Sequence, residues 1–276
     1  MNTYFTNTLD NNLKEKVYHL IDICKESDNL NGCIFLEEEL NTISNLPCYI
    51  YCVENTLLIG FLSIFVPDIN SCEIYSYVHP EYRHKHIFTN MYNNALNILN
   101  GYGISYIQIV CEPGSPGEHL IQAKGYSDYI CECMMKYQYK HTSVDCSDYK
   151  LIVSKDNELV KLAYNNIILG HCRIDYKNNC TTIYDVEILA KYQGHGYSKV
   201  LINMTLDHIS QLQAVEISTE SNTQNLKEAV NKKSSIVLHV TASNTKALRA
   251  YISCGFEIIE ELHFYNINPS NINQSI

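Results

Sequence analysis

Hydrophobic and polar positions change their spacing several times along the chain. In residues 11–27, NNLKEKVYHLIDICKES, apolar side chains recur every three or four positions, which is the spacing of one face of a helix. These side chains are Leu13, Val17, Leu20, Ile21 and Cys24. Residues 9–45 are therefore expected to hold this amphipathic helix and a second helix-like segment. The next apolar runs, residues 48–55 and 56–65, predict a β-hairpin that turns near Glu54 and Asn55.

Strand-like and helix-like segments alternate after this hairpin, and the whole order then repeats. In the first half, strands are expected at residues 72–78, 104–111 and 129–139, with helices at 88–100 and just before 124–126. In the second half, strands are expected at 149–154, 158–164, 166–176, 181–190, 235–240 and 255–265, with helices from about Tyr197 and at 245–254. Only KDN, residues 155–157, separates the first two strands of the second half, so the opening helix pair is missing there. The pattern predicts an α/β fold, with an α+β mixed sheet, that is built twice.

The polar, proline-free segment HTSVDCS, residues 141–147, lies between the two halves. The two domains are accordingly expected at residues 1–143 and 144–276. The residues between 213 and 235 look like an insertion into the second domain, partly helical at 225–233, for which a solvated excursion is the default expectation.

Composition narrows the classes of function. The chain has 276 residues, of which 46% are hydrophobic, and a formal net charge of -10. A broad electrostatic footprint for nucleic acid or an anionic membrane is therefore not expected. The N-terminal sequence MNTYFTNTLDNN has neither a basic nor an apolar stretch, and no apolar run approaches a length of roughly 18 residues. We expect a reduced, cytoplasmic chain.

The 12 cysteines are expected to be small apolar side chains rather than metal ligands. Cys131 and Cys133 have the spacing of a strand, and no second pair stands at the distance typical of a zinc site. No metal site is predicted.

The segment KYQGHGYSKVL, residues 191–201, places two glycines between an apolar strand-like run and the start of a helix. A bare turn at such a junction directs several backbone N–H groups and the positive end of the helix dipole to one point, which predicts an anion site. The spacing matches neither the Walker P-loop nor the dinucleotide-binding glycine pattern.

Two motifs in the second half together resemble the GNAT (GCN5-related N-acetyltransferase) superfamily. Residues 193–198 are similar to its Q/R-x-x-G-x-G/A loop, with Ser198 in place of the final glycine or alanine. Residues 238–256, LHVTASNTKALRAYISCGF, are similar to its strand followed by N-x-x-A-x-x-x-Y-x-x-x-G-F. The resemblance covers nearly the whole chain, loosely in the first half and with specific motifs in the second. It implies two tandem GNAT (acyl-CoA N-acyltransferase) domains.

The resemblance also implies where acetyl-CoA would bind. The pyrophosphate loop would be Gln193, Gly194, His195, Gly196, Tyr197 and Ser198. Backbone amides from Val186 to Ile188, on a strand that splays from its neighbour in this family, would hold the pantetheine arm together with Asn244 and Ala247. Lys191 and Lys199 flank the loop and could neutralise the pyrophosphate. The alternatives are a plain left-handed turn at the glycines, a simple helix cap at Asn244, and lysines that are merely solvated.

The resemblance makes Tyr251 the general acid that protonates the departing thiolate, with a core tyrosine as the alternative. His239 lies where related alanine acetyltransferases carry a glutamate base, and it is the first candidate for the general base. Glu187 is the second candidate, since a strand-packing role for His239 stays open, as does an ion pair for Glu187. The amide of Ile188 would stabilise the oxyanion.

The first half is similar to the same loop but has Arg83, His84, Lys85, His86, Ile87 and Phe88 at its positions. A Cβ at His86 is expected to obstruct a phosphate unless the loop is displaced. The position that corresponds to Tyr251 is Ile121, which cannot donate a proton. We therefore interpret residues 1–143 as a degenerate GNAT-like domain.

The expected function is transfer of an acyl group from CoA to a primary amine on a small molecule, a peptide or a protein N-terminus, in a monomer or homodimer that needs no metal. The competing classes are a non-catalytic acyl-CoA-binding or scaffold protein and a nucleotide-binding α/β protein.

Overall fold

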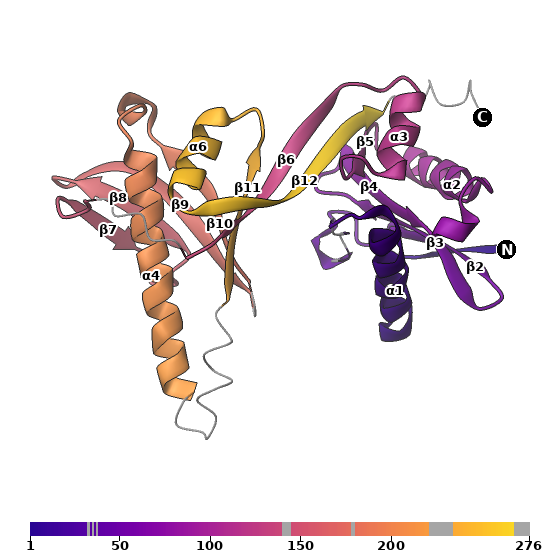
Figure 1. Ribbon diagram of the computed structural model, residues 1–276, viewed down its shortest axis with the longest axis horizontal. Coiled ribbons are helices and arrows are strands. Elements are labelled where there is room, and N and C mark those ends of the chain that lie inside the picture. The colour runs from indigo at the N-terminus through magenta and orange to yellow at the C-terminus, as the bar shows by residue number, and fades with distance from the viewer. Residues whose placement is uncertain are drawn as a thin grey trace. The chain divides into compact units, whose positions relative to one another are not determined.

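The computed structural model describes residues 1–31, 34, 36, 38–139, 145–177, 180–220 and 234–267, with side chains of residues 215–220 left out of the description. The chain divides into two compact units, which are described separately. Unit 1 consists of Met1–Cys131 and Glu261–Ile276, and unit 2 consists of Glu132–Glu260. Figure 1 labels most of the helices and strands of both units.

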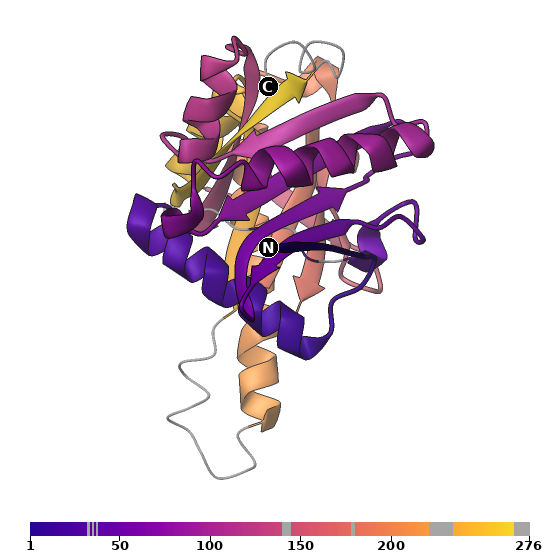
Figure 2. The same cartoon turned by 90° about the vertical axis from the view of Figure 1, so that its right-hand side faces the viewer.

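Unit 1 is a mixed sheet with helices packed against it. Its elements are β1 (Asn2–Thr6), α1 (Asn11–Asp28), β2 (Tyr49–Glu54), β3 (Leu57–Phe65), β4 (Ser71–Val78), α2 (Ile87–Gly101), β5 (Tyr106–Cys111), α3 (Pro116–Ala123) and the end of β12 (Phe256–Ile267). Its strand order is β1-β2-β3-β4-β5-β12, antiparallel except for the parallel pair β4–β5. Figure 2 views this unit from the side of the N-terminus.

Side-chain alternation along β3 assigns the helices to faces of this sheet. A Cβ on Gly60 would lie 2.7 Å from Ile87 and 3.1 Å from Met91, so Gly60 faces α2. Phe61, the next residue, is fully buried and faces the other side, where α1 contacts β3 and β4. Both faces of this sheet are therefore covered.

Unit 2 repeats the sheet with fewer helices. Its elements are β6 (Tyr129–Tyr137), β7 (Tyr149–Val153), β8 (Leu159–Tyr164), β9 (Ile167–Lys177), β10 (Cys180–Ile188), α4 (Tyr197–Glu220), β11 (Ser235–Thr241) and α6 (Thr245–Ser253). Its strand order is β7-β8-β9-β10-β11-β6, with β10 and β11 parallel. Cys172 of β9 lies 3.4 Å from Thr205 of α4, and α4 packs on α6. Both helices thus cover the face toward which Cys172 points.

The halves of the sequence exchange their last strands. Glu132–Lys136 of β6 pair with β11 inside unit 2, whereas His263–Ile267 of β12 pair with β5 inside unit 1. In unit 1, β12 thereby covers the free edge of β5, and in unit 2, β6 covers the free edge of β11. The domain boundary predicted between residues 143 and 144 lies outside the described residues, as does the predicted helical insertion at 225–233.

The predicted fold class is confirmed, with corrections in detail. In α1, the side chains of Val17, Leu20, Ile21 and Cys24 are buried as the periodicity predicted. The second helix-like segment before residue 45 is wrong as an α-helix, because the described residues there form only the 3-10 turn Glu38–Leu40. Strand β1 was not predicted. Among the described helices, none is long and apolar enough to cross a membrane.

Candidate functional site

The loop between β10 and α4 has the backbone that its two glycines allow. It follows a short 3-10 turn, Ala190–Tyr192, and both Gly194 (φ 83°) and Gly196 (φ 81°) are left-handed. An added Cβ at either glycine would meet no atom within 4 Å, so conformation rather than space demands glycine here. Tyr197 and Ser198 begin α4, and their amides precede the first carbonyl that an intrahelical bond could use, which suits an anion.

Gln193 closes the loop against the strand that precedes it. Its side-chain amide donates to the backbone carbonyl of Ile188 over 2.9 Å. The exposed ring of His195 stacks on Tyr197 at a centroid distance of 5.7 Å, and its Nδ1 lies 2.9 Å from the carbonyl oxygen of Gln193. Ser198 is half-buried in the first turn of α4. The six predicted loop residues therefore form one continuous turn.

Strands β10 and β11 part next to this loop. Their parallel pairing runs from Cys180–Ser235 to Ile183–Leu238, while the strands themselves continue to Ile188 and Thr241. The amide of Leu189 donates to β9 over 2.9 Å. Because backbone N–H groups alternate in direction along a strand, the amide of Ile188 points the other way, into the opening. Val186 and Ile188 are half-buried at this position.

Helix α6 carries the second predicted motif. Asn244 is its N-cap, and the side-chain oxygen accepts a hydrogen bond from the amide of Ala247 over 3.2 Å. Tyr251 lies one turn further, is only 6% exposed, and tilts against Phe256. Burial raises the pKa of Tyr251 to about 12, and the nearby thiols of Cys172 and Cys254 add to this shift. The phenol is therefore protonated at neutral pH.

The two candidate bases share the face of the sheet opposite the helices. Leu238 of β11 is buried beside Ile183, so His239 points to the other face, where it is exposed. Glu187 is exposed as well, and its register partner on β9 is His171. The residue after His171, Cys172, faces α4, so His171 and Glu187 lie on the opposite face. The protein thus separates a buried phenol on one side of the opening from proton acceptors on the other side.

Unit 1 has the same opening, and it contains a cavity. The pairing of β4 and β5 runs from Ser71–Tyr106 to Ile74–Ile109, although the strands continue to Val78 and Cys111. A cavity of about 460 Å³ lies there, lined by both strand ends, the loop after β4, and the first turns of α2 and α3. Sequence reasoning did not find this cavity.

The loop of unit 1 keeps the left-handed backbone without glycine. His84 (φ 61°) and His86 (φ 58°) occupy the positions of the two glycines. The backbone of this loop keeps the left-handed conformation of the glycine loop, and the two imidazoles are exposed where unit 2 has no side chain. Left-handed non-glycine residues cost roughly 1 kcal/mol each, so surrounding contacts must hold this turn.

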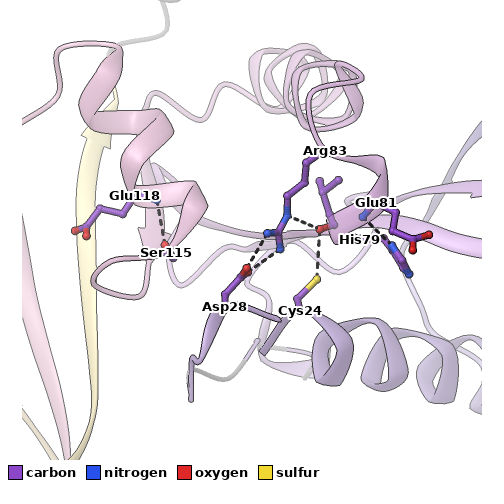
Figure 3. Close-up of polar contacts among 8 residues, drawn as sticks. Cys24, Asp28, His79, Glu81, Arg83, Ser115 and Glu118 are labelled. Carbon is purple, nitrogen blue, oxygen red and sulfur yellow. Dashed lines mark hydrogen bonds and ion pairs between the residues drawn. The ribbon is translucent and has the colours of Figure 1, made fainter. Parts of the chain in front are cut away.

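Arg83 supplies such contacts (Figure 3). Its guanidinium donates to both carboxylate oxygens of Asp28, over 2.7 and 2.6 Å, and its Nε donates to the carbonyl of Val78 over 3.2 Å. The bond to Val78 matches the one from Gln193 to Ile188 in unit 2. Ile121, at the position of the phenol, is buried and lines the cavity.

Comparisons with known proteins agree with this duplicated architecture. The family model described as Acetyltransferase (GNAT) family matches residues 14–126 and again residues 126–229. N-alpha-acetyltransferase 50 of Danio rerio is 31% identical over 121 residues, which cover 41% of this chain and 61% of that protein. The chain therefore spans less than two thirds of this curated relative.

Two solved structures share the fold along nearly the whole chain. A GCN5-related N-acetyltransferase from Sphaerobacter thermophilus has a TM-score of 0.69 at 14% identity, with 92% of each chain covered. A tandem GNAT protein from the clavulanic acid biosynthesis pathway has a TM-score of 0.60 at 11% identity, covering 96% of this chain and 98% of that one.

Proposed function

Since the chain belongs to the GNAT acetyltransferase family, we propose that unit 2 transfers an acetyl group directly from acetyl-CoA to a primary amine. The observation that carries this proposal is a combination found in unit 2: the left-handed glycine loop, the opening between β10 and β11, and the buried phenol of Tyr251. Unit 1 has the opening but has histidines in the loop and Ile121 in place of the phenol.

The residues present fit acetyl-CoA. The backbone amides of residues 194–198 would hold its diphosphate, since no Cβ stands at Gly194 or Gly196 and the start of α4 adds positive potential. On the open edge of β10, the amide of Val186 would pair with the pantetheine arm as an added strand would, and the amide of Ile188 would face the thioester carbonyl. Asn244 and Ala247, at the start of α6 just after β11 ends at Thr241, would contact the pantetheine arm from the helix side. Bound there, acetyl-CoA supplies a thioester as the acyl donor.

Each catalytic step has a candidate group in unit 2. On the open face of the sheet, His239 or Glu187 removes a proton from the acceptor ammonium, because a protonated amine cannot attack a carbonyl. The Ile188 amide stabilises the oxyanion of the attacked thioester. Tyr251, whose phenol is protonated at neutral pH, donates its proton to the departing thiolate. This pathway needs neither a metal nor a covalent enzyme intermediate.

The relative in Danio rerio supports an α-amine as the acceptor, because its name is that of an N-alpha-acetyltransferase. A free peptide or protein N-terminus is therefore the first acceptor to test, ahead of small primary amines.

The test is thiol release from acetyl-CoA in the presence of a panel of peptides with free N-termini, amino acids and polyamines. Tyr251→Phe should lower kcat by about 10²- to 10³-fold while leaving the affinity for CoA unchanged. Tyr18→Phe, at an exposed position of α1, is the matched control. Unchanged turnover in Tyr251→Phe would remove the proposed acid, and tight CoA binding without transfer to any amine would favour a scaffold.

A second role is favoured for unit 1 by its cavity of about 460 Å³. We propose that unit 1 holds an acyl donor without turning it over, because Ile121 offers no proton to a leaving thiolate. Calorimetry should then give two molecules of CoA per chain. A single molecule, lost on substitution of Gly196→Val, would confine binding to unit 2.

A further inference from the structure

A charged cluster lies on the open face of the unit 2 sheet, next to the splayed end of β10. In β9, Cys172 and Ile174 are fully buried and Cys172 contacts α4. Side chains alternate along a strand, so His171 and Arg173 point to the opposite face. Glu187 pairs in register with His171 and shares that face.

A β-bulge brings a second carboxylate to the same place. Tyr184 lies opposite Arg173 and Glu187 lies opposite His171, so β10 has one more residue than β9 across this interval. Asp185 sits in the bulge with a left-handed backbone, φ 51°. Its Oδ2 lies 3.4 Å from Nε2 of His171 and 3.4 Å from Nε of Arg173.

The imidazole of His171 therefore lies between two carboxylates. Its other nitrogen, Nδ1, is 3.9 Å from Oε2 of Glu187. Asp185 is the nearer carboxylate, and a carboxylate only accepts hydrogen bonds. In the neutral ring the hydrogen is accordingly held on Nε2, and the lone pair of Nδ1 is turned toward Glu187.

Unit 1 carries none of this chemistry at the corresponding positions. Phe61 and Tyr77 are the register pair there, where unit 2 has His171 and Glu187, and Phe61 is fully buried. The pairing of β3 with β4 runs from Gly60 to Phe65 without a register shift. In the described part of the chain, the bulge and the cluster thus occur in the unit that contains the buried phenol.

We infer that His171 is a positioning residue that takes the acceptor's proton from Glu187, an inference that rests on the proposed function. Glu187 removes a proton from the acceptor ammonium and passes it to Nδ1 of His171, and the imidazolium is stabilised by Asp185. His171 is 26% exposed and releases this proton to water. The 3.9 Å gap to Glu187 closes when the acceptor binds or is bridged by one water.

The step balances with the rest of the reaction. The amine nitrogen forms a bond to the acetyl carbon as the carbon–sulfur bond breaks, and the nitrogen loses two protons. One reaches solvent through Glu187 and His171. The other replaces the proton that Tyr251 gives to the thiolate.

The charged groups around His171 define the expected pH dependence. Lys161 faces it from β8 as its register partner, Arg173 lies two residues along β9, and Asp185 and Glu187 face it from β10. Only a neutral imidazole can take the proton from Glu187. The contribution of His171 to kcat/KM should therefore be smaller at acid pH than above neutrality.

The experiment compares full-length wild type and His171→Gln by thiol release, with acetyl-CoA and the best acceptor peptide of the panel, between about pH 5 and pH 9. The ratio of wild-type to variant kcat/KM should rise from about 1 at acid pH to about 10–100 above neutrality. Titration of the acceptor cancels in this ratio. His19→Gln, exposed on α1, should give a ratio of 1 throughout, and Asp185→Asn should follow His171→Gln in direction.

A ratio that differs from 1 but does not change with pH would indicate packing and overturn the relay. The relay would also be overturned if His239→Gln alone produced the pH-dependent ratio. Long-range ¹H–¹⁵N spectra give a readout that does not need turnover: the hydrogen of His171 should be found on Nε2 in wild type and be redistributed in Asp185→Asn. If wild type acetylates no amine, the proposed function itself fails; if wild type is active and His171→Gln keeps its profile, only the relay fails.

Discussion

Glu118 is the residue whose substitution most directly tests how the C-terminal strand is held in unit 1. It is 5% exposed, at the third position of α3 (Figure 3), and its Oε2 accepts the amide of Gly114 over 2.6 Å. Its Oε1 accepts both the Tyr265 hydroxyl, over 2.8 Å, and Nδ1 of His263, over 2.5 Å. The exchanged end of β12 is thus tied to α3 as well as to β5.

Glu118→Gln keeps the shape of this side chain but leaves it one acceptor oxygen, so at least one of the three donors loses its partner. Such a loss costs about 1–3 kcal/mol, and bonds to a charged acceptor are worth about 1.5–3 kcal/mol. A total of about 2–4 kcal/mol is expected, which would speed amide exchange at the end of β12 by about 30- to 1,000-fold. Hydrogen exchange measures this locally, and Glu15→Gln, exposed on α1, is the control.

The direction of the pKa shift of Glu118 determines how its stabilisation of unit 1 changes with pH. Burial alone would raise the pKa of Glu118, but the hydrogen bonds from Gly114, His263 and Tyr265 outweigh it and lower the pKa below its ordinary value. Its stabilisation is therefore complete above the unfolded pKa, about 4.3, and is lost as the pH falls through the lower folded value. The difference in amide exchange at the end of β12 between wild type and Glu118→Gln should narrow below about pH 4. A difference in amide exchange that is absent at neutral pH, or that widens in acid, would contradict the role assigned to Glu118.

Two further substitutions test a close backbone approach in unit 2 and an ion pair in unit 1. Gly170→Ala should impair transfer and, in a denaturant titration, lower the free energy of unfolding by about 1–3 kcal/mol, because its Cβ would lie close against the carbonyl oxygen of Glu187. In the same titration the control Gly101→Ala, whose Cβ would meet nothing within 4 Å, should be neutral or stabilising. Asp28→Ala should lower the thermal midpoint through a loss of about 1–3 kcal/mol, because it leaves the half-buried guanidinium of Arg83 unpaired; a midpoint equal to that of wild type would contradict the role assigned to this pair.

Local signals in the sequence predicted most of the elements. The periodicity of Val17 and Leu20 located α1, and the glycines at 194 and 196 located a turn that needs left-handed residues. The predicted Asn244 cap is present. These features depend on residues close together in the chain, where spacing and backbone preference act directly.

Features that depend on distant partners were not predictable in this way. Nothing local in residues 129–137 indicates that β6 pairs with β11, more than 90 positions later along the chain. His84 and His86 take left-handed conformations that histidine does not favour, and Arg83 is held by Asp28 from another element. The bulge at Asp185 is a register shift against β9 and has no composition signal. The roles of Tyr251 and the two candidate bases stay predictions.

A crystal structure after a soak with CoA would show whether unit 2 holds the acyl donor. We expect a diphosphate within hydrogen-bond distance of the amides of residues 194–198 and a sulfur atom beside the hydroxyl of Tyr251. A loop left empty while CoA occupies only the cavity of unit 1, or a phenol turned away from the sulfur, would contradict it.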